Sequence, residues 1–172
     1  HNPQDYPMAY FWMFILFLVV LLIVLHEISY RLVKNRILRS RRWDLNICCG
    51  HSDGGGLNVD IFQHDPGPSN FKKIDNIYAL PFEDKQFEHT LCSHTIEHVD
   101  DPEAFFAELR RVSRHVTIVV PPLWDPAAVF NIFEHRHIFL NVRKRFEDEL
   151  PPYIRLPFAE SVQDWLGQKI RG

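Results

Sequence analysis

Two short stretches rich in histidine and glutamate carry the side chains best suited to chemistry. His94, Glu97 and His98 occur within SHTIEHV, and residues 134–137 read EHRH. A histidine beside a carboxylate could transfer protons, because imidazole titrates near neutral pH. Either stretch could also supply metal ligands, but neither contains the closing ligands of a zinc site. We therefore predict no metal site and no catalytic residue here. The first stretch is interpreted as the end of a strand and the approach to a helix.

The three cysteines offer little further chemistry. Cys48, Cys49 and Cys92 show no metal-binding spacing, and nothing near them in the sequence resembles a thiol-activating site. A cytoplasmic location predicts free thiols. We expect Cys48 and Cys49 to be small, buried apolar side chains.

An uninterrupted apolar segment precedes these residues. Met8–Leu25 contains eighteen residues without a charge, and as a helix it would span about 27 Å, close to the hydrocarbon core of a bilayer. A signal peptide is disfavoured, because the leader HNPQDYP carries Asp5 and no cation, and no small-residue cleavage site follows. Six cations follow within a few turns, and they place that end in the cytoplasm: Arg31, Lys34, Arg36, Arg39, Arg41 and Arg42. The sequence predicts a single-pass membrane protein with its N-terminus outside.

His26 lies at the inner end of this span. It could bind the magnesium of a pigment or pair with Glu27 at the interface, and we prefer the interfacial pairing. The span has no small-xxx-small pattern, whereas its bulky aromatic residues offer area to a neighbouring apolar surface: Phe11, Trp12, Phe14 and Phe17. The predicted partners are therefore other membrane subunits and membrane lipid.

The remainder of the chain is acidic and long enough for one core. Residues 43–172 hold 13 of the 19 Lys and Arg and 20 of the 22 Asp and Glu. A nucleic-acid partner is disfavoured, because phosphate binding needs a basic face. The basic segment after the span is explained by topology and by anionic lipid headgroups.

Strands and helices alternate along this acidic segment. Four runs predict strands: Leu45–Cys49, Leu57–Phe62, Phe87–Ser93 and His115–Val120. Asp101–Ser113 predicts a helix, with Asp101 as its cap and Pro102 at the first helical position. Buried apolar strands in this order predict an α/β fold with a mostly parallel sheet. Beyond Leu140 the pattern weakens, and Ser161–Ile170 predicts one last short helix.

These residues resemble a known family. The order LNICCG, LNVDI, ALPFEDKQF, LCSHTIEHVDDPEAFFAELRRV and VTIVVPP is similar to the class I S-adenosylmethionine-dependent methyltransferases, over roughly Leu45 to Leu140. The resemblance implies a truncated Rossmann-like sheet after one transmembrane helix. It divides the chain into an external tail (1–7), a transmembrane helix (8–27), a basic juxtamembrane segment (28–43), a methyltransferase-like domain (44–140) and a C-terminal extension (141–172).

The resemblance also implies a cofactor site. In this family S-adenosylmethionine lies across the carboxyl ends of the parallel strands, at the point where the strand order reverses. The glycine turn falls on Cys48-Cys49-Gly50, the ribose-binding acid on Asp60 and the adenine-reading position on Asn76. The end of the fourth strand falls on Ser93. The implied cofactor-binding residues are Gly50, Asp60, Asn76 and Ser93.

Several positions depart from the family pattern. Cys48 replaces a glycine, and its side chain would crowd a ligand carried against the backbone. Asn76 replaces an aspartate, although Asp75 is adjacent. Gly54, Gly55 and Gly56 read as plain turn residues, and there is no room for a helix between Gly50 and Leu57.

Three functions remain open. The departures favour a pseudoenzyme, a structural or accessory subunit of a multi-subunit membrane complex, by analogy an energy-converting or photosynthetic one, for which no cofactor is expected. The alternative is a methyltransferase that uses S-adenosylmethionine on a membrane-associated lipid-like, quinone or tetrapyrrole substrate. The third is a membrane-tethered adaptor that binds the cofactor without transferring a methyl group.

Overall fold

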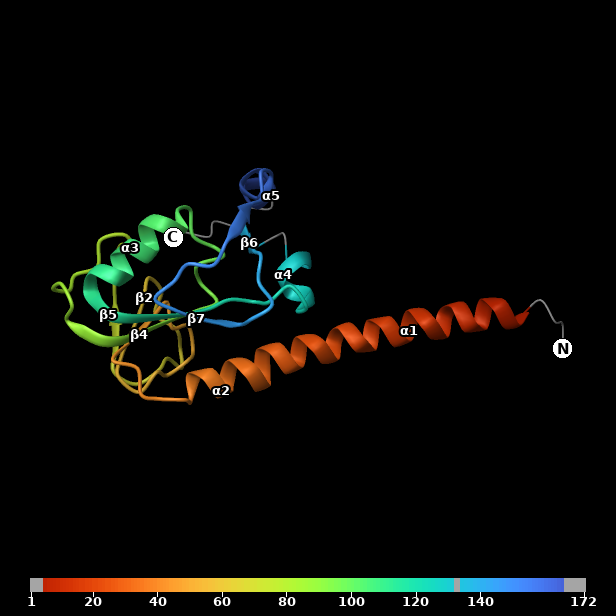
Figure 1. Ribbon diagram of the computed structural model, residues 1–172, viewed down its shortest axis with the longest axis horizontal. Helices are drawn as coiled ribbons and strands as arrows, with labels where there is room; N and C mark the ends of the chain where they lie inside the picture. The colour runs from red at the N-terminus through yellow and green to blue at the C-terminus, as the bar shows by residue number, and fades with distance from the viewer. Residues whose placement is uncertain (1–4, 132–133, 166–172) are drawn as a thin grey trace.

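A long N-terminal helix extends away from a small α/β domain in the computed structural model, which describes residues 5–131 and 134–165 (Figure 1). α1 (Asp5–Glu27) continues through a π-helical segment, η1 (Ile28–Val33), into α2 (Lys34–Leu38). We call this continuous element the N-terminal helix. Its stretch from Met8 to Leu38 is long and apolar enough to cross a membrane. The described part of the predicted tail 1–7 is helical from Asp5, and residues 1–4 lie outside the described residues.

The domain is built on one six-stranded sheet with the order β3-β2-β1-β4-β5-β7. β1 pairs in parallel with β2 and β4, β2 with β3, and β4 with β5, whereas β7 runs antiparallel to β5. The strands are β1 (Leu45–Ile47), β2 (Leu57–Asp60), β3 (Phe71–Lys73), β4 (Phe87–Ser93), β5 (Ser113–Val119) and β7 (Arg145–Glu147). The order reverses between β1 and β4, as in doubly wound sheets. The predicted Rossmann-like fold is confirmed.

One face of the sheet is covered by α3 (Pro102–Val112). Phe105, Leu109 and Val112 of this helix are fully buried in the main core with Cys92 and Ile118 of the strands. The predicted cap is present, since Asp101 Oδ1 accepts a hydrogen bond of 2.9 Å from the Ala104 amide. The sequence therefore predicted this helix to within one residue at each end.

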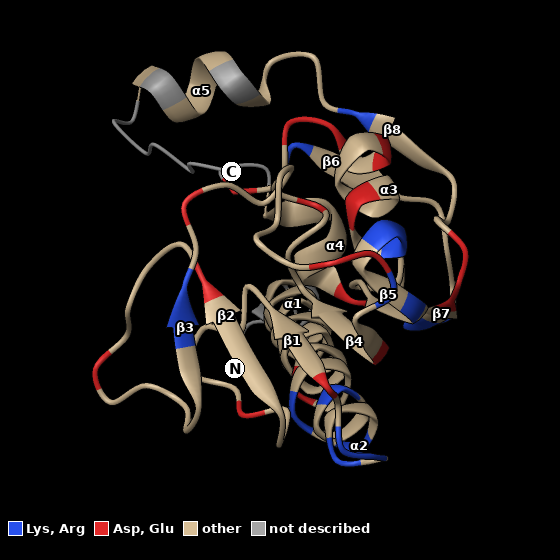
Figure 2. Ribbon diagram, turned by 90° about the vertical axis from the view of Figure 1, so that its left-hand side faces the viewer, with Lys and Arg blue, Asp and Glu red and all other residues tan. Residues whose placement is uncertain are grey.

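The opposite face is covered by the end of the N-terminal helix. Ile37 of α2 and Trp43 pack against Leu91 and Val119. These two strand residues are adjacent in sequence to Cys92 and Ile118, which belong to the core on the other face because successive strand side chains point to opposite faces. Trp43 is completely buried. Figure 2 shows that the basic residues around α2 gather at this end of the molecule. Residues of the segment 28–43, which we expected to be a basic juxtamembrane segment, thus pack against this face of the sheet.

The chain from Pro126 onward contains strands that the sequence did not predict. β7 extends the main sheet, and β6 (His137–Phe139) pairs antiparallel with β8 (Tyr153–Arg155). All three strands have three residues, too few to leave a visible alternation. Two short helices, α4 (Pro126–Phe130) and α5 (Ala159–Trp165), complete this part. The predicted last helix overlaps α5, and residues 166–170 of that prediction lie outside the described residues.

Candidate cofactor edge and histidine cluster

The turn after β1 brings Gly50 and Asp60 together at the carboxyl ends of the strands. The Gly50 amide donates a hydrogen bond of 2.9 Å to Asp60 Oδ2. Gly50 has a φ of +53°, and a Cβ at this residue would meet no atom within 4 Å. Cys48 also has a positive φ of 49°, a conformation that suits glycine better than a residue with a side chain. The backbone thus keeps the shape of a glycine turn although only one of its three residues is glycine.

Two cavities open at this edge and share Cys48, Gly50 and His94. The first, of about 220 Å³, is also lined by Asp60 and by apolar side chains, among them Ile61, Phe62, Ile77 and Val99. The second, of about 270 Å³, is lined by Ser93 of β4 and by Tyr30 and Lys34 of the N-terminal helix. Three of the four cofactor-binding residues implied by the resemblance therefore line one or both cavities: Gly50, Asp60 and Ser93.

Asn76 is the exception. Its side chain is exposed, and its Oδ1 accepts a hydrogen bond of 2.8 Å from the Tyr78 amide within the loop. The neighbouring Ile77 lines the first cavity instead. Asp75 is exposed as well. The structure thus does not bring Asn76 to the cavities, because its side chain closes a local turn.

Close packing explains why the next turn contains three glycines, Gly54, Gly55 and Gly56. A Cβ at Gly56 would lie 2.2 Å from the carbonyl oxygen of Trp43, and one at Gly54 would lie 2.8 Å from Cβ of Asn46. The turn packs closely against the start of β1. These glycines are turn residues, as the sequence indicated.

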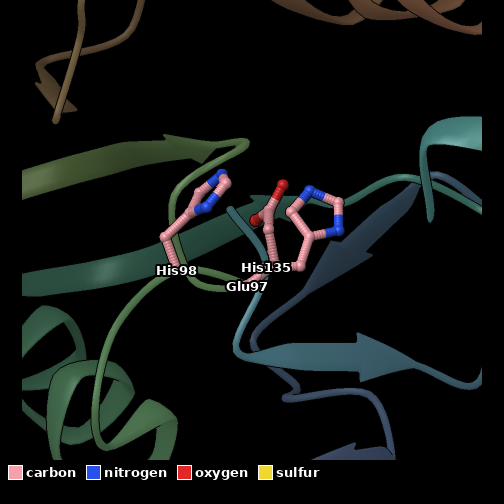
Figure 3. A group of neighbouring side chains, drawn as sticks. All are labelled: Glu97, His98 and His135. Atoms are coloured by element: carbon pink, nitrogen blue, oxygen red, sulfur yellow. The ribbon is translucent and has the colours of Figure 1, made fainter. Parts of the chain in front are cut away.

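A second group of side chains meets beside the first cavity. The carboxylate of Glu97 and one ring nitrogen each of His98 and His135 lie within 4.8 Å of one another (Figure 3). Glu97 is 1% exposed and His135 is 4% exposed, whereas His98 also lines the first cavity. The sequence did not predict this group, because 37 positions separate His98 from His135. The dipeptide Glu-His at 97–98 and 134–135 was the available signal, although it also occurs at 88–89, outside this group.

The charges in this group are set by burial and by each other. Burial opposes ionisation of Glu97, but His94, His98 and His135 outweigh it and lower its pKa to about 2. Burial lowers the pKa of His94 and of His135, against the attraction of Glu97. At neutral pH Glu97 is therefore a buried carboxylate, and burial favours the neutral imidazoles of His94 and His135.

The cysteines are held as thiols. Burial, with a smaller contribution from Asp60, raises the pKa of Cys49 to about 12. Burial likewise raises the pKa of Cys48 and of Cys92. All three are free, as predicted, and thiols this weakly acidic are poor nucleophiles.

The N-terminal helix is bonded directly to the domain. His26 Nδ1 lies 3.0 Å from Asp125 Oδ1, and Lys144 Nζ donates a hydrogen bond of 2.6 Å to Ser29 Oγ. The expected pairing of His26 with Glu27 is wrong, because Glu27 forms an ion pair with Arg31 one turn further along the helix. His26 faces the domain, where the buried Asp125 offers the stronger partner.

The comparisons with known proteins agree with this arrangement. Residues 63–120 match the model of the methyltransferase domain family. The domain is methyltransferase-like. The matched segment runs from the loop after β2 to the end of β5 and contains Ser93, Glu97 and His98. The predicted resemblance to the S-adenosylmethionine-dependent methyltransferases is thereby confirmed. A comparison with curated proteins finds no match.

Several solved structures resemble part of this chain. A S-adenosylmethionine-dependent methyltransferase from Thermotoga maritima, described as a possible histamine N-methyltransferase, is 20% identical, with 58% of this chain and 55% of that chain covered and a TM-score of 0.44. The PH0226 protein from Pyrococcus horikoshii is 18% identical, with 81% and 79% covered and a TM-score of 0.44. An Aquifex aeolicus methyltransferase is 13% identical, with 56% and 67% covered and a TM-score of 0.42. The chain thus spans a little over half the length of the Thermotoga protein.

Proposed function

We propose that this protein is a membrane-anchored methyltransferase whose acceptor is held at the bilayer surface. One observation carries this proposal: Tyr30 and Lys34 of the N-terminal helix line the same cavity as Gly50 and Ser93 of the strand ends. A membrane anchor that lines the cavity at the strand ends would keep this cavity, the proposed cofactor site, next to the membrane. The six cations around the end of the helix favour a cytoplasmic domain and an outside N-terminus.

The residues at the strand ends fit S-adenosylmethionine. The open space beside Gly50 would admit a ligand against the backbone, Asp60 would accept hydrogen bonds from its ribose hydroxyls, and Ser93 would contact it from β4. When bound, the cofactor supplies an electrophilic methyl group. The protein's own contribution would be alignment of the acceptor, which can supply much of the rate without a dedicated base.

The acceptor proposed is lipid-like, for example a quinone or an isoprenoid. Ile61, Phe62, Ile77 and Val99 line the first cavity and give it an apolar wall. Phe62 is 55% exposed, so this wall continues to the surface. An acceptor that partitions into the bilayer would gain by burying its apolar surface against such a wall.

The direct experiment measures methyl transfer in lipid nanodiscs. The full chain is incubated with methyl-labelled S-adenosylmethionine and a membrane lipid extract, and label in the lipid fraction is counted. We expect incorporation that Asp60→Ala abolishes and that His115→Ala, an exposed residue on β5, leaves unchanged. Absence of label, with the cofactor bound, would replace the proposal by the tethered adaptor.

An accessory subunit of a membrane complex is the second candidate. Asn76 is turned away from the cavities, and the aromatic side chains of α1 are exposed along the helix: Phe11, Trp12, Phe14 and Phe17. These side chains offer area to neighbouring helices. Replacing Met8–Leu25 by a leucine-rich span keeps the anchor and removes this surface. Loss of co-purifying subunits on this change would favour the accessory role, and an unchanged set would remove its main support.

A further inference from the structure

We propose that Glu97, His98 and His135 bind a divalent transition-metal ion, with Zn²⁺ as the best-matched ion. Two histidines and one glutamate form the ligand set of a known class of catalytic zinc site, in which a fourth position stays open. The three ligand groups lie within 4.8 Å of one another. Tetrahedral zinc would hold its ligand atoms about 3.4 Å apart, so small side-chain rotations would complete the site.

The Glu97 carboxylate supplies the independent reason for a cation. Its side chain is 1% exposed, and neither oxygen has a hydrogen-bond donor in the described part of the chain. His94 Nδ1, at 3.3 Å from Oε1, makes no hydrogen bond to it and forms an ion pair with Glu97 only when its imidazole is protonated. A buried carboxylate without donors is costly, and such groups are normally paired or bound to a metal. A bound cation would satisfy this charge.

The backbone holds the two halves of the site together. The carbonyl oxygen of Glu97 accepts hydrogen bonds from the amides of Arg136, at 2.9 Å, and His137, at 3.1 Å. An ion pair between Asp100 and Arg136 adds a second link. The segments 97–100 and 134–137 are therefore fixed against each other before any ligand binds.

His98 is also set in the orientation of a metal ligand. Its Nδ1 lies 2.8 Å from the carbonyl oxygen of Glu134, which can only accept, so Nδ1 must carry the proton. The lone pair is then on Nε2. Outer-shell hydrogen bonds of this kind, from the second ring nitrogen to a carbonyl, accompany almost all metal-binding histidines.

The open side of the site meets the first cavity, which His98 helps to line. A metal there would present its remaining position to a water or to an oxygen of a molecule in the cavity, and would act on it as a Lewis acid. This inference rests on Glu97, His98 and His135 alone. It does not require that the cofactor edge binds S-adenosylmethionine.

The test uses the untagged full chain in detergent after removal of metal with a chelator. Calorimetric titration should show one Zn²⁺ bound per chain, and Co²⁺ should give the visible absorption of a site with nitrogen and oxygen ligands. Mg²⁺, which prefers oxygen ligands, should not compete. Glu97→Gln and His135→Asn should weaken Zn²⁺ binding by at least the roughly 10–100-fold seen when an outer-shell partner is lost.

The matched control is His115→Asn, which changes a histidine on β5 and should leave Zn²⁺ affinity unchanged. His98→Asn, at the half-buried cavity wall, serves as the deciding variant if the changes at the buried residues prevent folding. The inference is overturned if the parent binds no Zn²⁺ stoichiometrically. It is equally overturned if folded His98→Asn, judged by circular dichroism, binds Zn²⁺ as tightly as the parent.

Discussion

Lys144 Nζ donates a hydrogen bond of 2.6 Å to Ser29 Oγ, and both side chains are buried although 115 positions separate them. The same ammonium lies 4.0 Å from Asp125 Oδ2, and the other oxygen of Asp125 contacts His26. Buried polar groups with fixed partners tolerate few alternative arrangements. The N-terminal helix is therefore an integral part of the domain, and a change at this joint should alter the stability of both.

Ser29→Ala should destabilise the contact between the N-terminal helix and the domain. The change removes the hydroxyl that accepts from Lys144 and leaves a buried ammonium less well paired, which should cost about 1–3 kcal/mol of unfolding free energy. Hydrogen exchange of the full chain in detergent should show faster exchange in η1 and α2. Ser40→Ala is the control, because the Ser40 hydroxyl donates its hydrogen bond to the carbonyl oxygen of Ile37 in its own turn. Equal exchange in the two variants would contradict the role of this bond.

Lys144 should make stability depend on alkaline pH. Burial lowers the pKa of its ammonium to about 8, against the attraction of Asp125 and Glu97. In the unfolded chain a lysine stays protonated up to about pH 10.4, so between these values the unfolded state binds more protons. Stability should therefore rise with pH across this window, by up to about 3 kcal/mol.

Lys144→Met isolates this contribution. Other groups titrate equally in both proteins, so the difference between their thermal unfolding midpoints reports Lys144 alone. The parent should gain stability relative to the variant from pH 8 to pH 10. An unchanged difference over this range would show that Lys144 titrates normally in the folded chain.

Restoring the family glycine at Cys48 should strengthen cofactor binding. Cys48 already has the positive φ that glycine prefers, so Cys48→Gly fits the backbone and removes a side chain from both cavities. We expect S-adenosylmethionine to bind this variant about tenfold more tightly, or 1.4 kcal/mol, and Asn76→Asp, at a side chain outside the cavities, to add nothing. His115→Ala, on the exposed surface of β5, is the control. Equal affinity in Cys48→Gly and the parent would show that Cys48 does not limit binding.

The orientation in the membrane can be tested by proteolysis. Protease added to spheroplasts should leave residues 45–172 uncut, because the cations after the span favour a cytoplasmic domain. The same domain should be digested once the membrane is opened with detergent. Digestion from the outside in intact spheroplasts would reverse the orientation.

The sequence predicted the elements whose pattern is long enough to read. β4 was predicted residue for residue, and α3 was marked by its cap and by the periodic burial of Phe105 and Leu109. β3 and β7 have only three residues each and were missed. The packing of α2 on the sheet was missed for another reason: membrane topology already explained the cations of this segment, so its apolar residues were not assigned to a core.

The site was predicted where residues are adjacent in sequence and missed where distant segments meet. Asp60 ends β2 and Gly50 lies in the turn after β1, so the strand order alone brings them together. Glu97 and His135 meet only because backbone hydrogen bonds join segments 97–100 and 134–137. Likewise, Tyr30 and Lys34 reach the cavity through the packing of the N-terminal helix, which composition does not reveal.

Equilibrium binding of S-adenosylmethionine to the full chain in nanodiscs tests the central claim most directly. The account predicts saturable binding of one cofactor per chain with a dissociation constant in the micromolar range, lost in Asp60→Ala because the carboxylate proposed to bind the ribose is removed. Retention of binding in His115→Ala would show that the loss is specific to the cofactor edge. No binding at millimolar cofactor would contradict the account and leave a methyltransferase-like domain that serves another purpose.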